Sequence, residues 1–228
     1  MKMYYMLNGG RNERGVLVYP EAQALYKTLG IKRVLFIVYA LVEEYWQQRW
    51  QKAGALITIP GMDMRSLTIY DTDPMVITEA LQWADYVYFP GGSQESLLSR
   101  MHALGTDVLF ESTLAVGSVK LLGGGSAGAM VMGSHCIVGQ SEVRQLIAGL
   151  DVFPQYVVDS HFSQRDRLPR LQAIIDQNPS LQGLGIDEDT AVVFDAQRVI
   201  KAVYGPGSVT ECTTNGIKLY DTHTNFSR

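Results

Sequence analysis

Short runs of apolar residues alternate with helix-like segments along the first half of the chain. The apolar runs are residues 34–38, 55–59 and 86–89. The helical segments are residues 41–52 and 74–83, the second beginning at Asp73-Pro74. Continuous apolar strands that alternate with helices indicate a parallel sheet covered on both faces. The sequence therefore predicts an α/β protein, a three-layer α/β/α fold with a mostly parallel sheet.

The rest of the chain fits one domain over residues 1–228. With 228 residues, 46% of them hydrophobic, the chain is long enough to bury one large core. Residues 1–7 are expected to form a first strand, because this apolar stretch is too short for a signal peptide and lacks a small-residue cleavage site. Further helices are expected at residues 94–101 and 107–116, a strand at 120–122, and a more β-rich C-terminal third at 191–219.

The strand at 120–122 leads into a turn of small residues with a single serine, Gly124-Gly125-Ser126-Ala127-Gly128. This pattern matches G-x-S-x-G, in which a sharp turn between strand and helix exposes a nucleophilic hydroxyl. The backbone N–H of Ala127 would then be available to an oxyanion. The alternative is a glycine-rich loop that only closes a buried strand.

A serine nucleophile requires a histidine to take its proton. Among the four histidines, His161 stands at the end of the strand-like run 156–159 and opens a polar segment. That is the edge at which open α/β sheets build their sites. The alternative is a hydrogen-bonded structural histidine in a loop.

An acid that orients the histidine is the third requirement. Asp187, Glu188 and Asp189 stand in a row between two apolar segments. Alternation along an extended chain allows only one or two of them to face a site, and the sequence does not say which. A solvated turn is the alternative reading of such a cluster.

Four segments in this order resemble cyanophycinase and, more broadly, the serine peptidases grouped with peptidase E, the aspartyl dipeptidase. They are residues 89–94 (FPGGSQ), 124–129 (GGSAGA), 159–170 (DSHFSQRDRLPR) and 185–191 (GIDEDTA). The resemblance runs from about Val34 to Val203 and implies a Ser-His-Glu triad that maps onto Ser126, His161 and Glu188. It also implies a class I glutamine-amidotransferase-like (flavodoxin-like) fold and a homodimer.

The resemblance implies hydrolysis of β-aspartyl or aspartyl peptide bonds, in cyanophycin-type material or in short peptides. The partner is therefore a peptide substrate with an aspartyl carboxylate. Its predicted binding residues are Gln94, Asp159, Ser160, Arg165, Arg167 and Arg170. Arginine forks suit this role because they bind carboxylates at two points. Asp166 is expected to cap a helix that carries Arg167 and Arg170 on one face, with Arg165 in the loop just before it. The alternative for the arginines is a solvated basic helix start paired with Asp159 or Asp166.

The chain departs from the cyanophycinase pattern in two ways. Ser160 stands where glutamine is usual between the aspartate and the histidine, and Asp166 and Pro169 replace glycines. These changes bear on substrate preference and leave the three triad positions in place.

The chemistry expected is acyl transfer, with an oxyanion bound by the backbone of Gly91, Gly92 and Ala127. Glutaminase chemistry is disfavoured, because glutaminases of this fold carry cysteine where this chain has Ser126. A second hypothesis is a catalytically silent binding or regulatory member of the glutamine-amidotransferase-like fold.

Composition narrows the other partners. A net charge of −4 and a pI near 5.6 disfavour nucleic acid, and no apolar run approaches the length of a membrane span. We expect a cytoplasmic protein. No cofactor and no metal are predicted, because metal-binding spacings are missing, and Cys136 and Cys212 are interpreted as small apolar residues.

Overall fold

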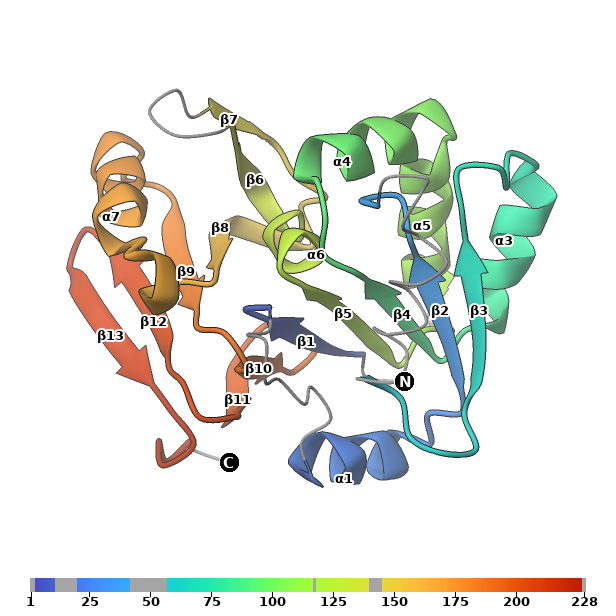
Figure 1. Ribbon diagram of the computed structural model, residues 1–228, viewed down its shortest axis with the longest axis horizontal. Coiled ribbons are helices and arrows are strands. Elements are labelled where there is room, and N and C mark those ends of the chain that lie inside the picture. Colours follow the sequence, from blue (N-terminus) through green and yellow to red (C-terminus); the bar gives the residue numbers. More distant parts are fainter. Residues whose placement is uncertain (1–2, 11–19, 42–56, 117, 140–144, 227–228) are drawn as a thin grey trace.

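The computed structural model describes residues 3–10, 20–41, 57–116, 118–139 and 145–226. Over these residues it is a mixed α/β fold with two sheets (Figure 1). The first sheet has seven strands in the order β11-β10-β1-β5-β4-β2-β3. Its strands are β1 (Tyr4–Asn8), β2 (Arg33–Ile37), β3 (Asp63–Leu67), β4 (Tyr86–Phe89), β5 (Leu121–Gly125), β10 (Ala191–Phe194) and β11 (Ile200–Tyr204). Five neighbouring strands in this order, β1, β5, β4, β2 and β3, run parallel to one another. Strand β10 is antiparallel to β1, and β11 is antiparallel to β10.

The second sheet has six strands in the order β13-β12-β9-β8-β6-β7. Its strands are β6 (Gly133–Val138), β7 (Gln145–Ala148), β8 (Phe153–Ser160), β9 (Gln182–Ile186), β12 (Val209–Thr213) and β13 (Gly216–Tyr220). The central strands β6, β8 and β9 are parallel. The helices are α1 (Pro20–Leu29), α3 (Pro74–Trp83), α4 (Gln94–Ala103), α5 (Thr106–Val116), α6 (Ala127–Met130) and α7 (Leu168–Gln177), with a 3₁₀ turn at Ser163–Arg165.

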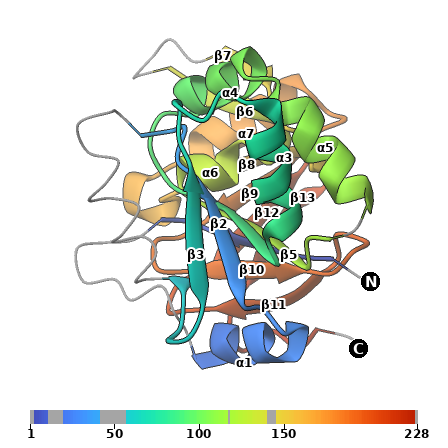
Figure 2. The same cartoon turned by 90° about the vertical axis from the view of Figure 1, so that its right-hand side faces the viewer.

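Side chains alternate between the two faces of the first sheet, as a strand period of two requires. Met6, Phe36 and Tyr88 point to the face that α1 covers with Ala22 and Tyr26. The opposite face packs against α3, α4 and α5, which lie on the other side of the sheet from α1 (Figures 1 and 2).

The two sheets share one core. The ring of Phe153 on β8 lies 5.1 Å from that of Tyr5 on β1 and 4.8 Å from that of Phe194 on β10. All three side chains are buried. The sheets are therefore packed against each other, and loops from both sheets meet around the central short helix α6 (Figure 1).

Several predicted elements are confirmed. The strands at 86–89 and 34–38 are β4 and β2, within a residue, and Asp73 caps α3 by accepting a hydrogen bond from Met75 N. The β-rich C-terminal third is also present, as β10 to β13.

Other predictions need correction. The prediction of one sheet was incomplete, because six of the thirteen described strands build a second sheet. The strand predicted at 55–59 is wrong over its described residues, because Ile57 is helical and the next strand is β3 at Asp63–Leu67. The predicted helix 41–52 lies outside the described residues from 42 onward. Within the described ranges, no helix combines the length and the apolar composition that a bilayer crossing requires.

Candidate active site

Ser126 occupies a strained turn between β5 and α6. Its φ of 52° and ψ of −117° lie outside the regions that side chains normally adopt. The glycines on either side allow close packing: a Cβ at Gly124 would lie 2.8 Å from the nitrogen of Ala129, and one at Gly128 would lie 2.8 Å from Phe89 Cβ. The turn has the geometry that the G-x-S-x-G pattern predicts.

His161 follows the end of β8 and faces Ser126. Its Nε2 lies 2.8 Å from the Ser126 Oγ, within hydrogen-bond distance. The side chain of His161 is mostly buried, and its backbone also has a positive φ, 50°. The histidine thus follows a strand of the second sheet, and the serine that it contacts follows a strand of the first sheet.

Glu188, in the loop after β9, is the carboxylate that contacts this histidine. Its Oε1 lies 2.6 Å from His161 Nδ1. Asp187 binds backbone instead, accepting hydrogen bonds from Ser163 N and Ser208 N at 3.0 Å each. Of the three consecutive carboxylates, the structure therefore places Glu188 in line with His161 and Ser126.

The loop of Glu188 has a partner that the sequence analysis missed. The Oε1 of Gln164 accepts a hydrogen bond from the Glu188 N–H at 2.9 Å. Gln164 stands three residues after His161, within the segment 159–170. This closeness in sequence to the histidine was the one feature that could have indicated a role for Gln164.

The pKa of His161 lies below its ordinary value. Burial is the largest cause, since it disfavours the imidazolium, and the positive charges of Arg165 and Arg167 act in the same direction. The hydrogen bond to Glu188 opposes them and raises the pKa. The net effect favours the neutral ring, the form that accepts a proton.

The predicted oxyanion residues lie next to Ser126. A Cβ on Gly91 would stand 3.2 Å from the Ser126 Cβ and 3.6 Å from its Oγ, so the backbone at Gly91 closely approaches the hydroxyl. Gly92 lines the adjoining cavity. Ala127 opens α6, where the first N–H groups of a helix have no partner inside the helix.

A cavity of about 350 Å³ opens over Ser126 and His161. Gln94, Ser160 and the arginines of the 159–170 segment line it. Three apolar residues that the sequence analysis missed, Met130, Ile137 and Val138, line it as well. The lining arginines are Arg165, Arg167 and Arg170. The amide of Gln94 lies against Met130 Sδ at 3.1 Å. The Oγ of Ser160 is buried and has no hydrogen-bond partner among the residues that the structure describes.

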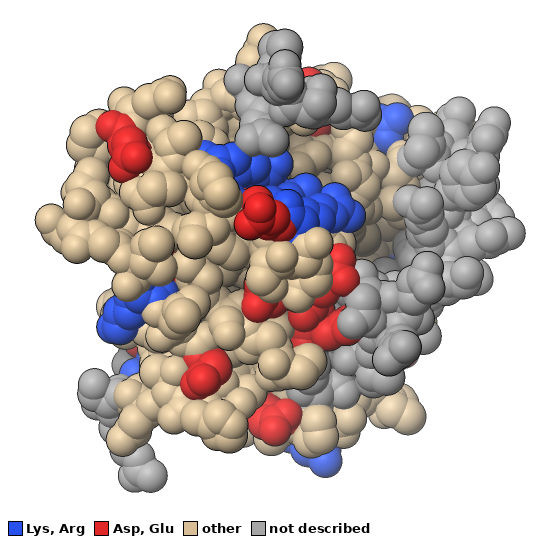
Figure 3. Space-filling view, turned by 60° about the vertical axis from the view of Figure 1, so that its left-hand side comes forward, with Lys and Arg blue, Asp and Glu red and all other residues tan. Residues whose placement is uncertain are grey.

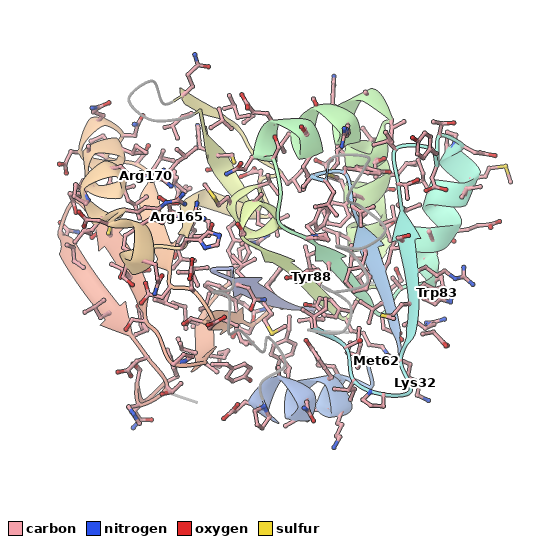
Figure 4. The ribbon with its side chains drawn as sticks, in the orientation of Figure 1. Lys32, Met62, Trp83, Tyr88, Arg165 and Arg170 are labelled. Carbon is pink, nitrogen blue, oxygen red and sulfur yellow. The ribbon has the colours of Figure 1, made fainter. Side chains whose placement is uncertain are left out.

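Asp159 does not line the cavity, although it was predicted to bind substrate. It is completely buried and lies beneath two of the arginines. Arg167 Nη1 donates to Asp159 Oδ1 at 2.7 Å, and Arg170 binds both carboxylate oxygens. Arg165, at the end of the 3₁₀ turn, and Arg170, in the first turn of α7, both line the cavity (Figure 4). Lys and Arg side chains gather beside acidic ones on this face of the molecule (Figure 3).

The predicted cap of this helix was wrong. Asp166 has a left-handed backbone with φ 47° and ends the 3₁₀ turn Ser163–Arg165, and Arg167 occupies the N-cap position of α7. The extra turn displaces the helix start by one residue. Arg165 consequently belongs to the 3₁₀ turn and not to a loop.

The described residues contain no group of three or more His, Cys, Asp or Glu side chains arranged to hold a metal ion. Both cysteines are buried as free thiols. Burial raises the pKa of Cys136 to about 12 and that of Cys212 to about 11, so neither is ionised near neutral pH.

The fold and this site define a mixed α/β protein in which a serine, a histidine and a glutamate form one hydrogen-bonded row. Residues 7–202 match the sequence model of peptidase family S51. The chain belongs to this family, which confirms the resemblance to the cyanophycinase and peptidase E group.

Its relatives include several cyanophycinases. The chain is 33% identical to the cyanophycinase of Geminocystis herdmanii over 162 residues, which are 65% of this chain and 59% of that protein. It is 39% identical to the cyanophycinase of Synechococcus elongatus over 132 residues, 54% of this chain and 40% of the relative. The matched part therefore spans about half the length of these relatives.

Two solved structures share the fold. One is a peptidase from an acI-B1 Actinobacterium, with a TM-score of 0.70, 22% identity, and coverage of 100% of this chain and 98% of the other. The second is a putative peptidase E protein from Listeria monocytogenes EGD-e, with a TM-score of 0.63, 19% identity, and coverage of 91% and 100%.

Proposed function

We propose that the protein is a serine peptidase that hydrolyses peptide bonds next to an aspartyl carboxylate. The observation that carries this proposal is the row of hydrogen bonds from Ser126 Oγ to His161 and from His161 to Glu188, at 2.8 and 2.6 Å. A weak nucleophile, a base within reach and an acid that orients the base are the three parts of a catalytic triad.

In the proposed mechanism, His161 Nε2 takes the proton of Ser126 while Oγ attacks the peptide carbonyl carbon. Glu188 accepts a hydrogen bond from the Nδ1–H of His161, which fixes the tautomer and stabilises the imidazolium that forms. The oxyanion is bound by backbone N–H groups of Ala127 and of Gly91-Gly92. His161 then gives its proton to the leaving amine, and water, activated by the same histidine, releases the acid product and restores Ser126.

The arginines support an acidic substrate. Arg165, Arg167 and Arg170 line the cavity, and the buried carboxylate of Asp159 pairs with two of them. Three guanidiniums facing one such carboxylate leave an excess of positive charge at the cavity wall. A substrate carboxylate placed there would gain charge-assisted hydrogen bonds in a partly dry site. An aspartyl side chain next to the scissile bond meets this requirement.

We extend the proposal to the fold class and the assembly. Five neighbouring parallel strands, with α1 on one face and α3 to α5 on the other, support the three-layer glutamine-amidotransferase-like arrangement for the first sheet. A single domain over residues 1–228, the homodimer and the cytoplasmic location stay predictions.

A fluorophosphonate probe tests the proposal directly, because it reacts with an activated serine and not with an ordinary hydroxyl. We expect labelling of Ser126 in the intact protein and none in Ser126→Ala. Ser99→Ala is the matched control, since this exposed helical serine donates its hydroxyl hydrogen bond to Ser96 O of its own helix. A protein that stays unlabelled would favour the silent binding member of the fold.

A substrate panel tests specificity. It compares β-Asp-Arg polymer, β-aspartyl and α-aspartyl dipeptides, and the same dipeptides with the aspartyl carboxylate amidated. Cleavage should require the free carboxylate. Equal rates on amidated peptides would contradict the proposed role of the arginines.

A further inference from the structure

The end of strand β1 contacts all three loops that carry the proposed triad. Three successive carbonyls accept one backbone hydrogen bond each: Asn8 O from Ser126 N at 3.0 Å, Gly9 O from His161 N at 2.7 Å, and Gly10 O from Asp189 N at 2.8 Å. The Gly9 N–H in turn donates to Thr190 O at 3.0 Å. The loops come from different strands in both sheets, and residues 8–10 are the segment that all three share.

The three donors have one backbone feature in common. Ser126, His161 and Asp189 have φ values of 52°, 50° and 53°, in the left-handed region that residues with a side chain rarely adopt. Such conformations persist only where surrounding contacts enforce them. The carbonyls of residues 8–10 supply one such contact to each strained residue.

Gly10 also lies against the imidazole. A Cβ on Gly10 would stand 2.7 Å from His161 Nε2 and 3.1 Å from Nδ1, and it would come still closer to Cε1. The glycine backbone therefore packs directly on the ring. It limits how far the ring can turn away from the line between Ser126 Oγ and Glu188 Oε1.

Gly9 packs just as closely against the backbone of the loop that carries Glu188. A Cβ there would lie 2.6 Å from the carbonyl carbon of Asp187 and would overlap the carbonyl oxygens of Ile186 and Asp187. Two consecutive glycines are thus needed for one short segment to reach both loops. Gly9 allows close contact with the loop of Glu188, and Gly10 allows close contact with the ring of His161.

We infer that the backbone of residues 8–10 is a common template for the three loops and that Gly10 is a positioning residue that fixes the His161 ring. This inference rests on the proposed function for its kinetic consequence, whereas its structural consequence can be measured without activity.

The first test is Gly10→Ala, with Gly61→Ala as the matched control. Gly10 has a φ of 92° and Gly61 a φ of 90°, so both substitutions impose the same backbone cost, but no atom that the structure describes lies within 4 Å of a Cβ at Gly61. With an aspartyl dipeptide, Gly10→Ala should lower kcat about a hundredfold, as expected for a catalytic group displaced by roughly 1 Å. KM should change little. Gly61→Ala should retain the wild-type kcat.

The second test measures thermal unfolding in a double-mutant cycle with His161→Ala. In the wild-type background Gly10→Ala should lower Tm more than Gly61→Ala does. In the His161→Ala background, where no ring is left to meet the new methyl group, its effect should fall to that of Gly61→Ala. If Gly10→Ala alone does not fold, the double variant should, because the ring that causes the overlap is gone.

The outcomes separate the two proposals. An equal Tm loss in both backgrounds, a double variant that does not fold, or a loss of activity seen only in KM would overturn the positioning role of Gly10. A wild-type protein without peptidase activity that still shows the Tm coupling would contradict the proposed function and leave the positioning of the ring intact.

Discussion

Arg170 holds the carboxylate of Asp159 at two points, with Nε on one oxygen and Nη2 on the other. Asp159 is completely buried, whereas the Arg170 side chain keeps 14% of its surface exposed and reaches the cavity. The pair therefore fixes the direction of a guanidinium in advance of binding, which reduces the entropy cost of gripping a substrate carboxylate.

Replacing Asp159 with asparagine should destabilise the protein, because two arginines then lose their buried counter-charge. Breaking a buried ion pair from one side costs about 3 kcal/mol in unfolding free energy. Urea denaturation measures this loss. The control is Asp176→Asn on α7, whose carboxylate accepts an exposed hydrogen bond from Gln172. Equal effects of the two substitutions would show that the Asp159 pairs add no stability.

Ser126→Ala and His161→Ala should each reduce kcat/KM by about a thousandfold or more, and the double variant should lose little beyond either single variant. Residues that act as one unit in a proton transfer show this non-additivity. Glu188→Gln should cost less than either, because it disturbs orientation and not the nucleophile itself. Additive losses, or a larger loss for Asp187→Asn than for Glu188→Gln, would contradict the assigned roles.

The pH profile follows from the lowered pKa of His161. The neutral ring is the base, so activity should persist as pH falls until it passes a midpoint below about 6.5, the ordinary histidine value. Arg165→Gln removes a positive charge that lowers this pKa, so the midpoint should move to higher pH. Glu188→Gln removes a hydrogen bond that raises it, so the His161 titration should move to lower pH.

Histidine NMR titration, together with kcat/KM measured against pH, distinguishes these directions. Lys27→Gln on α1 provides the control for a simple change in net charge, since α1 lies at the lower edge of the view in Figure 1, away from α7 at the upper left. If Lys27→Gln shifted the midpoint of the pH profile as much as Arg165→Gln does, the local effect of Arg165 on the pKa of His161 would be excluded.

The parts of the fold that the sequence predicted are those with a local signal. Strand β4 is a continuous apolar run whose four residues are all buried, and α3 has an aspartate cap followed by proline. Strand β3 was missed because it lies at the edge of the first sheet and exposes Asp63 and Arg65, so it lacks an apolar run. The second sheet was missed because strand pairing is decided by contacts distant in sequence.

The site shows the same division. The sequence offered Ser126 in a glycine turn, one histidine after a strand, and three adjacent carboxylates, and the structure brings one member of each set together. The alternative that paired the arginines with Asp159 anticipated this contact, although not the complete burial of the carboxylate. Nothing local indicated that Gly10 would pack on the imidazole, because these two segments approach each other only after the two sheets have packed.

Ser160 offers the sharpest test of substrate size, and our last prediction concerns it. Its hydroxyl is buried without a hydrogen-bond partner in the described part of the chain, and Ser160 lines the cavity at the position where the cyanophycinase pattern usually has glutamine. The shorter side chain removes an amide that would help to hold an extended chain. The wild-type protein should therefore cleave short β-aspartyl peptides faster than intact cyanophycin. Ser160→Gln should raise the ratio of polymer to dipeptide kcat/KM, while Ser160→Ala, which only removes an unpartnered hydroxyl, should keep the wild-type ratio. Polymer cleavage by the wild type at the dipeptide rate or above would overturn this ranking.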